Sequence, residues 1–183
     1  MLIGLMGKAG AGKDTLAAQL APLGFARVAF ADALYEEVAS AYGVTVELLR
    51  EHKDEDLDAV GSRPREILQN WGVSRREANP DYWVFLAEEK ITALRDAGTS
   101  VVVTDVRFPN EYRAIVKGGG ILVRVVRDAD HLRLRGAVAE HISETALDGF
   151  LADAVVENRE GNPADMLRQL MANPHGFFAR GAS

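Results

Sequence analysis

A glycine-rich segment near the start of the chain, GKAGAGKDT at residues 7–15, most constrains how this sequence can fold. It follows a short apolar run, Leu2–Met6, and it opens a helical pattern, Asp14–Leu20, so a strand, a loop and a helix come in succession. Glycines let backbone N–H groups turn inward around a polyphosphate, and the helix N-terminus adds partial positive charge there. Lys13 can reach the terminal phosphates as a point charge. We therefore interpret the segment as a phosphate-binding loop (P-loop); a glycine-rich turn with a solvated lysine would need all these features to coincide by chance.

One position departs from the usual pattern of such loops. A serine or threonine normally follows the lysine directly and contacts magnesium. In this chain Asp14 follows Lys13, and Thr15 comes one position later. Both side chains offer oxygen atoms, so either could serve as the ligand.

Composition limits the class of protein. The chain has 183 residues, enough for one domain with a substantial core, and 48% of them are apolar. A net charge of −6 argues against binding a nucleic acid polymer, so an anionic ligand would need a local cationic site. The absence of cysteine excludes disulfides and thiolate ligands. The N-terminal apolar run breaks at Gly7 and Lys8, and no stretch reaches the ~20 apolar residues of a membrane span, so we expect a cytoplasmic protein without a membrane partner.

Five apolar runs rich in β-forming residues alternate with helical patterns. The runs are continuous, which is typical of strands buried on both faces of a parallel sheet. The predicted strands are Leu2–Met6, Arg27–Phe30, Val101–Thr104, Ile121–Val126 and Ala154–Val156. This alternation predicts an α/β three-layer fold around a central, mostly parallel five-stranded sheet. Ligands bind at the carboxyl ends of the strands in such sheets, so the residues that follow each strand form one set.

Helical patterns fill the intervals between these runs. The segment 33–69 looks mostly helical, with a charged break at 51–58. Asn79-Pro80 has the form of an N-cap followed by proline at the first helical position, and Gly98 is a natural stop. The helix between them carries an apolar stripe: Trp83, Leu86, Ala87, Ile91 and Leu94. A last helix is predicted after Asn162-Pro163, with Leu167, Leu170 and Met171 on its apolar face.

Charged residues follow two of the predicted strands. An aspartate at a strand end beside a P-loop holds magnesium directly or through water, and we favour that role for Asp105 over the capping of a turn. Arg107 lies two residues further on in an extended segment, so it points the same way and could face a phosphate; the alternative is a surface salt bridge to Glu111. We expect Asp32 to be the N-cap of a helix beginning near Ala33, and its place at a strand end also allows a contact with substrate.

Arginines gather in two parts of the chain. Arg63 and Arg65 lie in the first turn of a helix that starts at Pro64, where the helix dipole disfavours cations, so they suggest a nearby anion. Solvated charge is an equally good interpretation for these two and for Arg75 and Arg76.

The second group of arginines, Arg124, Arg127, Arg133 and Arg135, precedes His141. An arginine-bearing segment that closes over the reacting groups can exclude water from phosphoryl transfer. Because Arg133 and Arg135 are two residues apart, they would not share a helix face.

Aromatic residues could supply a surface on which a base stacks. Trp83 fits the core better, since it lies on the apolar stripe, whereas Trp71 suits either role.

Together these segments resemble the deoxynucleoside monophosphate kinases that bacteriophages encode and, more distantly, adenylate kinase and other small P-loop kinases. The matching segments span nearly the whole chain in family order: residues 7–15, FAD at 30–32, PRE at 64–66 with Leu68-Gln69 and Gly72, Asp81 with Trp83, DVRFPNE at 105–111, His141 with Ser143-Glu144, and residues 153–158. The P-loop alone is specific only for nucleotide binding. The blocks at 105–111 and 143–144 narrow the resemblance to this family.

The resemblance implies a P-loop kinase fold in a single domain over residues 1–183. It implies a helical acceptor-binding region at about 33–78 and an arginine-bearing lid at about 127–145. ATP and a deoxynucleoside monophosphate would be the co-substrates and Mg²⁺ the cofactor.

The resemblance also implies roles for individual residues. ATP would be held by Gly10, Ala11, Gly12, Lys13, Asp14, Thr15 and Asn158, the last beside the adenine. Magnesium would be placed by Asp14, Thr15 and Asp105, and Asp14 could instead meet the acceptor phosphate. The catalytic residues would be Lys13, Arg107 and Asp105. The acceptor would contact Asp32, Arg65, Gln69, Trp71, Arg107 and Glu144. The lid would carry Arg127, Arg133 and Arg135.

The expected reaction transfers the γ-phosphoryl group of ATP to the 5′-phosphate of a deoxynucleoside monophosphate. Its acceptor oxygen is already anionic, so positioning and charge neutralisation would carry the catalysis. Two alternatives stay open: a P-loop kinase for another small acceptor such as dephospho-coenzyme A or a sugar acid, and a nucleotide-binding regulator without phosphoryl transfer. The chain lacks the Asn-Lys-x-Asp motif of GTP switches. An isologous homodimer is the base-rate expectation for its assembly.

Overall fold

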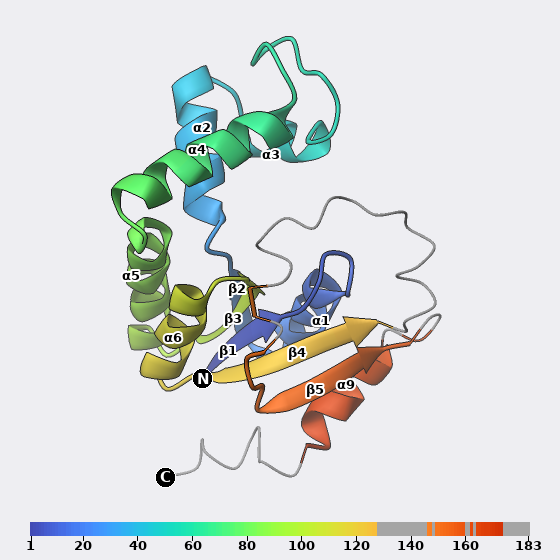
Figure 1. Cartoon of the computed structure of the whole chain (residues 1–183). Coiled ribbons are helices and arrows are strands. Elements are labelled where there is room, and N and C mark those ends of the chain that lie inside the picture. Colours follow the sequence, from blue (N-terminus) through green and yellow to red (C-terminus); the bar gives the residue numbers. More distant parts are fainter. Residues whose placement is uncertain (128–145, 148, 160–161, 163, 174–183) are drawn as a thin grey trace. The chain divides into compact units, whose positions relative to one another are not determined.

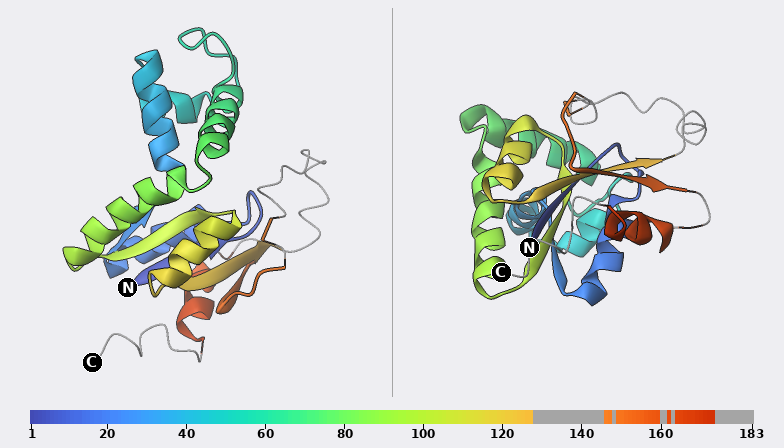
Figure 2. Two further views of the ribbon diagram at one scale, coloured as in Figure 1. Left: turned by 60° about the vertical axis from the view of Figure 1, so that its left-hand side comes forward. Right: turned by 90° about the horizontal axis from the view of Figure 1, so that it is seen from below.

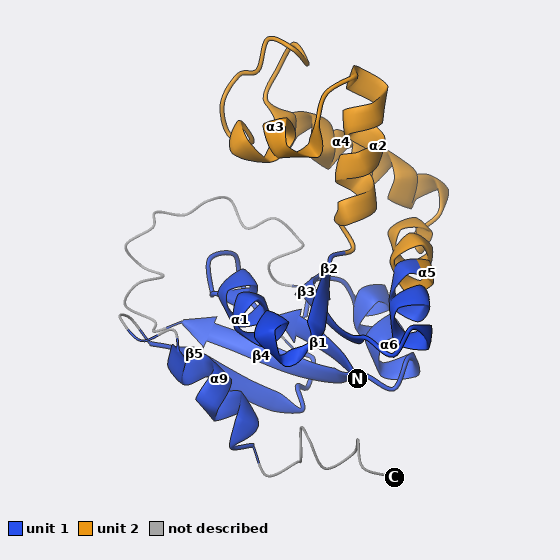
Figure 3. Ribbon diagram, turned by 180° about the vertical axis from the view of Figure 1, so that it is seen from behind, with its two compact units in different colours: residues 1–29, 90–183 blue, residues 30–89 orange. Residues whose placement is uncertain are grey.

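The computed structural model describes residues 1–127, 146–147, 149–159, 162 and 164–173. The chain divides into two compact units, which Figure 3 shows in different colours. Unit 1 comprises residues 1–29 and 90–183, and unit 2 comprises residues 30–89. No helix among the described residues is long and apolar enough to span a membrane.

Unit 1 is built on a five-stranded sheet (Figure 1). In spatial order the strands are β2 (Phe25–Val28), β3 (Ser100–Val106), β1 (Leu2–Met6), β4 (Ile121–Arg127) and β5 (Ala154–Asn158). All neighbouring strands are parallel. All five residues of β1 are buried, because this strand has a partner on each side and helices cover both faces of the sheet. The predicted five-stranded parallel sheet is therefore confirmed.

Helices cover both faces of this sheet (Figure 2). On one face α1 (Lys13–Leu20) and α9 (Ala164–Met171) pack against each other, and they share an apolar core with Ile3 and Leu5 of β1. On the other face α6 (Pro109–Lys117) packs over β1 and β4. There Ile115 comes so close to the sheet that a Cβ on Gly4 would lie 3.0 Å from its Cγ1 atom. These layers are the three-layer α/β fold that the alternation of patterns predicts.

Unit 2 is helical. It contains α2 (Asp32–Tyr42), α3 (Val46–Glu51), α4 (Pro64–Ala78) and the part of α5 (Tyr82–Asp96) up to Glu89. A core of five buried residues joins α2, α3, α4 and the segment between α3 and α4: Val38, Ala39, Leu49, Val60 and Leu68. Trp83 is 2% exposed and its Nε1 donates a hydrogen bond to the Gly72 carbonyl at 3.4 Å, so its predicted place in the core is confirmed.

Three local predictions need correction. Strand β2 lies two residues before the predicted Arg27–Phe30, because Ala29 and Phe30 are buried by packing and not by strand pairing. Asp32 is the first residue of α2 and not its N-cap, which is Ala31. Asp105 lies inside β3, since this strand continues to Val106, beyond the predicted end at Thr104.

Candidate active site

The loop between β1 and α1 turns by means of glycines in left-handed conformations. Gly7, Gly10 and Gly12 have φ angles of 139°, 74° and 105°, which L side chains rarely adopt. At Gly7 the approach is also tight, since a Cβ there would lie 2.2 Å from the Val125 carbonyl oxygen of β4. Gly12 is the N-cap of α1, so the N–H groups of the first helical turn open onto the loop. The loop thus has the conformation that the P-loop pattern predicts.

The predicted phosphate-binding lysine lies inside this loop. Lys13 is 7% exposed, and its Nζ donates hydrogen bonds to the carbonyls of Gly7 at 2.7 Å and Lys8 at 2.9 Å. Burying an ammonium group is costly unless it is hydrogen-bonded, and these carbonyls meet that need. The Lys13 charge is therefore held where the loop would receive a polyphosphate.

Two strand-end residues contact the second half of the loop. Arg127 ends β4 and Asn158 ends β5, and the two are partners in the register of the sheet. Arg127 Nη1 donates to the Gly10 carbonyl at 3.4 Å, and Asn158 Nδ2 donates to the Ala11 carbonyl at 2.9 Å. The resemblance assigns Arg127 to the lid and Asn158 to the adenine; those roles stay predictions, and the structure adds a contact of both side chains with the loop backbone.

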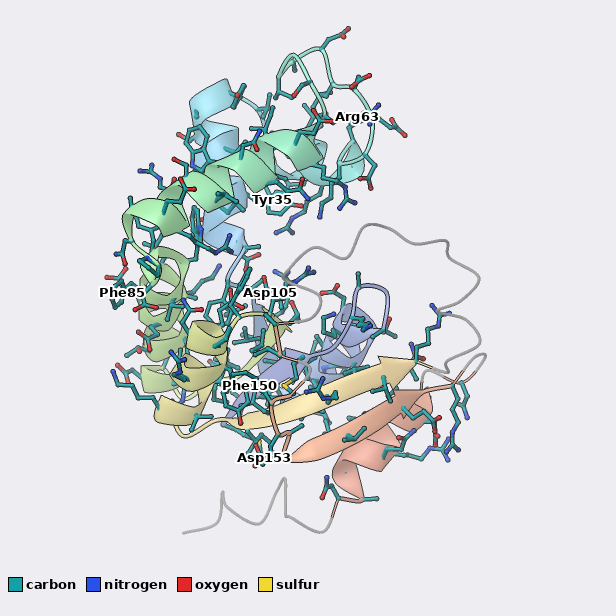
Figure 4. The ribbon with its side chains drawn as sticks, in the orientation of Figure 1. Tyr35, Arg63, Phe85, Asp105, Phe150 and Asp153 are labelled. Carbon is teal, nitrogen blue, oxygen red and sulfur yellow. The ribbon has the colours of Figure 1, made fainter. Side chains whose placement is uncertain are left out.

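The predicted magnesium ligands occupy neighbouring elements of unit 1. Asp14 and Thr15 are exposed in the first turn of α1. Asp105 is half-buried near the carboxyl end of β3, the strand beside β1 (Figure 4). The described residues contain no cluster of three or more His, Cys, Asp or Glu that could hold a metal by itself. Two carboxylates and a hydroxyl from neighbouring elements fit Mg²⁺, which keeps water and substrate phosphate oxygens among its ligands.

Arg107 follows β3, and the turn that carries it is shaped by a buried carboxylate. Glu111 is 3% exposed, and its Oε2 accepts hydrogen bonds from the backbone N–H groups of Arg107 at 2.7 Å and Phe108 at 3.0 Å. The contact between Arg107 and Glu111 thus involves the Arg107 backbone, and the Glu111 carboxylate lies in the interior. Sequence reasoning missed this role, although Pro109 followed by Glu111 has the spacing of an N-terminal helix cap.

Asp32, a predicted acceptor contact, lies in unit 2 beside a cationic and aromatic group. Asp32 is 8% exposed, and its Oδ1 accepts a hydrogen bond from Arg50 Nη2 at 3.0 Å. The Arg50 guanidinium carbon is 5.0 Å from the ring centroid of Tyr35, and Lys53 Nζ is 5.9 Å from the same centroid. Figure 4 labels Tyr35 on α2. Sequence reasoning did not single out these three residues, because the contact with Asp32 joins positions 18 residues apart and has no local pattern.

The other predicted acceptor residues of unit 2 lie on α4. Arg65 and Gln69 are exposed and four residues apart, so they share a helix face. Arg65 donates a hydrogen bond to the Asp54 carboxylate. That bond lowers the pKa of Asp54 below its ordinary value and raises the pKa of Arg65. Trp71 lies on another face, half-buried, and its Nε1 donates to Glu37 Oε2 at 2.8 Å.

Glu37 joins three helices of unit 2 and was also missed from the sequence. Besides Trp71, its carboxylate accepts hydrogen bonds from Arg75 Nε at 3.0 Å and from the Tyr82 hydroxyl. Burial raises the pKa of Glu37, but the hydrogen bonds from Trp71, Tyr82 and Arg75 together outweigh that effect, so the net pKa is lower than usual. Arg75 is thus paired with a carboxylate, and its guanidinium lies 5.2 Å from the Tyr82 ring centroid. These contacts differ from the interpretation of Arg75 as a charge that contacts only solvent.

Three predicted site residues, Arg133, Arg135 and Glu144, lie outside the described residues, as do His141 and Ser143. Their roles in the lid and the acceptor site stay predictions.

Comparison with known sequences finds viral relatives. No model of a known protein family matches the chain. A protein of Acanthamoeba polyphaga mimivirus named "Putative deoxynucleotide monophosphate kinase" is 32% identical over 143 residues, which cover 69% of this chain and 74% of that protein. The ORF77 protein of Ictalurid herpesvirus 1 is 40% identical over 90 residues, which cover 48% of this chain and 38% of that protein.

Solved structures support the fold. A shikimate kinase from Aquifex aeolicus superposes with a TM-score of 0.52 at 17% identity, covering 96% of this chain and 97% of that one. A sugar kinase from Janibacter sp. HTCC2649 superposes with the same TM-score of 0.52 at 16% identity, covering 94% of this chain and 92% of that one. At these identities the likeness shows the shared kinase fold and does not bear on the substrate.

Proposed function

We propose that this chain transfers the γ-phosphoryl group of ATP to the 5′-phosphate of a deoxynucleoside monophosphate. The chain belongs to the same P-loop kinase family as the mimivirus relative. The observation that carries the phosphoryl-transfer part is the loop of unit 1, with Lys13 hydrogen-bonded inside it and Asp105 on the neighbouring strand. The name of the mimivirus relative supports the deoxynucleotide part.

On the donor side, loop N–H groups and Lys13 would neutralise the phosphates of ATP, and Asp14, Thr15 and Asp105 would hold Mg²⁺. Magnesium supplies charge neutralisation at the phosphate oxygens when bound. The protein's own contribution is a preorganised set of donors, which costs no reorganisation during the reaction. Arg107, held by the bonds of its backbone to Glu111, would add a further positive charge.

On the acceptor side, unit 2 offers the residue types that a nucleoside monophosphate needs. Arg65 can bind a phosphate, and Gln69 on the same helix face can hydrogen-bond a base edge. Arg50 is fixed by Asp32 at 3.0 Å and lies over Tyr35, so its guanidinium is oriented before a ligand arrives. A phosphate acceptor needs no strong general base, and the described residues of unit 2 include no buried histidine to act as one.

The test is a coupled assay of ADP release with ATP and magnesium, run against dTMP, dGMP, dCMP and dAMP and their ribose counterparts. We expect ADP release that depends on one or more of the deoxynucleotides and is faster than with the matching ribonucleotides. Activity with none of them, from folded protein that binds ATP, would overturn the acceptor assignment in favour of another small acceptor. Slow ATP hydrolysis unaffected by any acceptor would instead indicate a regulator.

A further inference from the structure

Side chains from within the P-loop and from the strand ends beside it donate hydrogen bonds to the loop backbone. Lys13 Nζ binds the carbonyls of Gly7 and Lys8, in the first half of the loop. In the second half, the strand-end side chains of Arg127 and Asn158 donate to the carbonyls of Gly10 and Ala11 respectively. The 2.9 Å bond from Asn158 is well within hydrogen-bonding distance, whereas the 3.4 Å bond from Arg127 is long, so Asn158 provides the firmer restraint.

The bond to Asn158 determines the orientation of a single peptide group. In a planar trans peptide the C=O of one residue and the N–H of the next point in opposite directions. Because the Ala11 carbonyl faces Asn158, the Gly12 N–H faces away from it. The Ala11 N–H is already used within the loop, donating to the Lys8 carbonyl at 3.2 Å. The Gly12 N–H is therefore the loop donor whose direction depends most on Asn158.

The packing around Asn158 leaves it little freedom. A Cβ on Gly12 would lie 2.4 Å from Asn158 Nδ2, so the amide occupies the space that a side chain at position 12 would need. Its nitrogen faces the Ala11 carbonyl, since an oxygen there would place two acceptors in contact. Asn158 thus has one orientation, set by β5 below it and by the loop beside it.

We propose that Asn158 is a positioning residue that holds the Ala11–Gly12 peptide so that the Gly12 N–H is presented to the phosphates of the donor nucleotide. The inference rests on the proposed function in one respect, namely that the loop binds a polyphosphate. In this role Asn158 acts on phosphate binding indirectly, by orienting the loop backbone, in addition to any contact with the base.

The experiment compares four variants: Asn158→Ala, Asn158→Leu, Asn158→Asp and the control Val155→Thr. Leucine and aspartate keep the size of asparagine but cannot donate at neutral pH. Val155 lies on the same strand, three residues before Asn158, is 60% exposed and pairs in register with Arg124. The measurements are the KM for ATP and for the deoxynucleotide, kcat, and the Kd of MgATP by calorimetry.

We expect Asn158→Ala and Asn158→Leu to weaken MgATP binding by roughly 5-fold, the effect of one lost hydrogen bond, with kcat lowered as well. The KM for the deoxynucleotide should stay at the wild-type value, and Val155→Thr should match wild type in every measurement. A merely structural role for Asn158 would instead raise both KM values or lower the melting temperature alone.

The aspartate variant provides a second, independent readout. As a carboxylate it would face the Ala11 carbonyl oxygen without a proton to donate. The loss of MgATP affinity at about pH 7.5 should therefore be larger for Asn158→Asp than for Asn158→Ala. A protonated carboxyl can donate to that carbonyl, so its activity relative to wild type should recover as the pH falls towards about 5. The pH profile of Asn158→Asp against that of the wild type therefore tests the positioning role even if Asn158→Ala does not fold.

Two results would overturn the inference: MgATP affinity within about two-fold of wild type for both Asn158→Ala and Asn158→Leu, or an aspartate variant whose pH profile parallels wild type. The proposed function fails separately, if wild-type protein neither binds MgATP nor transfers phosphate. Wild-type activity together with unaffected Asn158 variants would leave the proposed function standing and remove the inference alone.

Discussion

Lys13 is a buried lysine whose ammonium group is hydrogen-bonded by the loop backbone. Its Nζ donates hydrogen bonds to two loop carbonyls, so its charge is held at the loop backbone. We expect Lys13→Ala to lower kcat by about 10²–10³-fold, as for the loss of one preorganised donor at a developing charge, while the protein still folds. The coupled assay measures turnover, and circular dichroism with a thermal melt checks the fold.

Lys8 is the matched control for this variant. It lies in the same loop but is exposed, and only its backbone carbonyl contacts Lys13. Lys8→Ala should therefore keep turnover within about two-fold of wild type, because an exposed charge contributes little. Near-normal turnover by Lys13→Ala would contradict the kinase assignment.

Glu111 stabilises the turn that carries Arg107. Its buried carboxylate satisfies the N–H groups of Arg107 and Phe108, and alanine would leave both without that acceptor. We expect Glu111→Ala to lower the free energy of unfolding by about 2–4 kcal/mol and also to slow turnover, since the turn that carries Arg107 loses its anchor.

Glu111→Gln separates the two effects of this change. It keeps one oxygen acceptor at the same place, so it should lose less than half as much stability as the alanine variant. Urea unfolding curves give the comparison. Equal losses for the two variants would show that the negative charge of Glu111, and not the shape of its hydrogen bonds, is what matters.

At the residue scale the sequence predicts the loop better than its surroundings. Gly7, Gly12 and Lys13 are recognisable because the motif is local, and a strand and a helix flank it directly. The contacts of Asn158 with Ala11 and of Arg50 with Asp32 join residues 147 and 18 positions apart. Such pairs follow from strand order and helix packing, which no local pattern contains.

At the scale of elements, Glu37 ties α2 to α4 and α5 through Trp71, Arg75 and Tyr82. The folded-state pKa of Glu37 lies below its ordinary value of 4.5. The contribution of this carboxylate to stability is therefore fully present above that value and is lost as the pH falls through the lower, folded-state pKa. We expect the stability of the wild type to fall more steeply than that of Glu37→Gln in this acidic range, as measured by urea unfolding at a series of pH values.

Two outcomes of that series are informative. At neutral pH Glu37→Gln should be less stable than wild type, because the amide cannot pair with the Arg75 charge. The difference between the two proteins should shrink on acidification, since the wild-type carboxyl becomes neutral as well. A constant difference across the series would mean that Glu37 does not titrate in the way its contacts require.

Element boundaries show where sequence patterns fail. β1 coincides with the predicted Leu2–Met6, because Gly7 ends the apolar run where the strand itself ends. β2 is displaced, because Phe30 continues an apolar run beyond the last paired residue. Helix α6 was not predicted at all, since its first turn is stabilised by the Glu111 carboxylate at a place where the residues look extended. Burial and strand pairing give the same apolar signal, and only the structure separates them.

At the scale of the whole molecule, the parallel sheet could be predicted but not the order of its strands. Continuous apolar runs indicate strands buried on both faces, and all five strands fit that pattern closely enough to be found. The order β2-β3-β1-β4-β5 depends on which edges pair across the sheet. Close approaches such as that of Ile115 to Gly4, where the absence of a side chain leaves room for α6, likewise depend on tertiary packing and not on a local pattern.

The division into two units leads to a last prediction, tested by hydrogen exchange with mass spectrometry. β1 is hydrogen-bonded on both sides and wholly buried, so its amides should exchange by global unfolding, more slowly than any in residues 30–89. MgATP should slow exchange in residues 7–15, and a deoxynucleoside monophosphate should slow exchange in α2 and α4, because each ligand stabilises the segment that it contacts. In Lys13→Ala the effect of MgATP on the loop should be strongly reduced, whereas the effect of the monophosphate should persist. Protection of the loop by the monophosphate alone, with no change in α2 or α4, would contradict the assignment of the acceptor to unit 2.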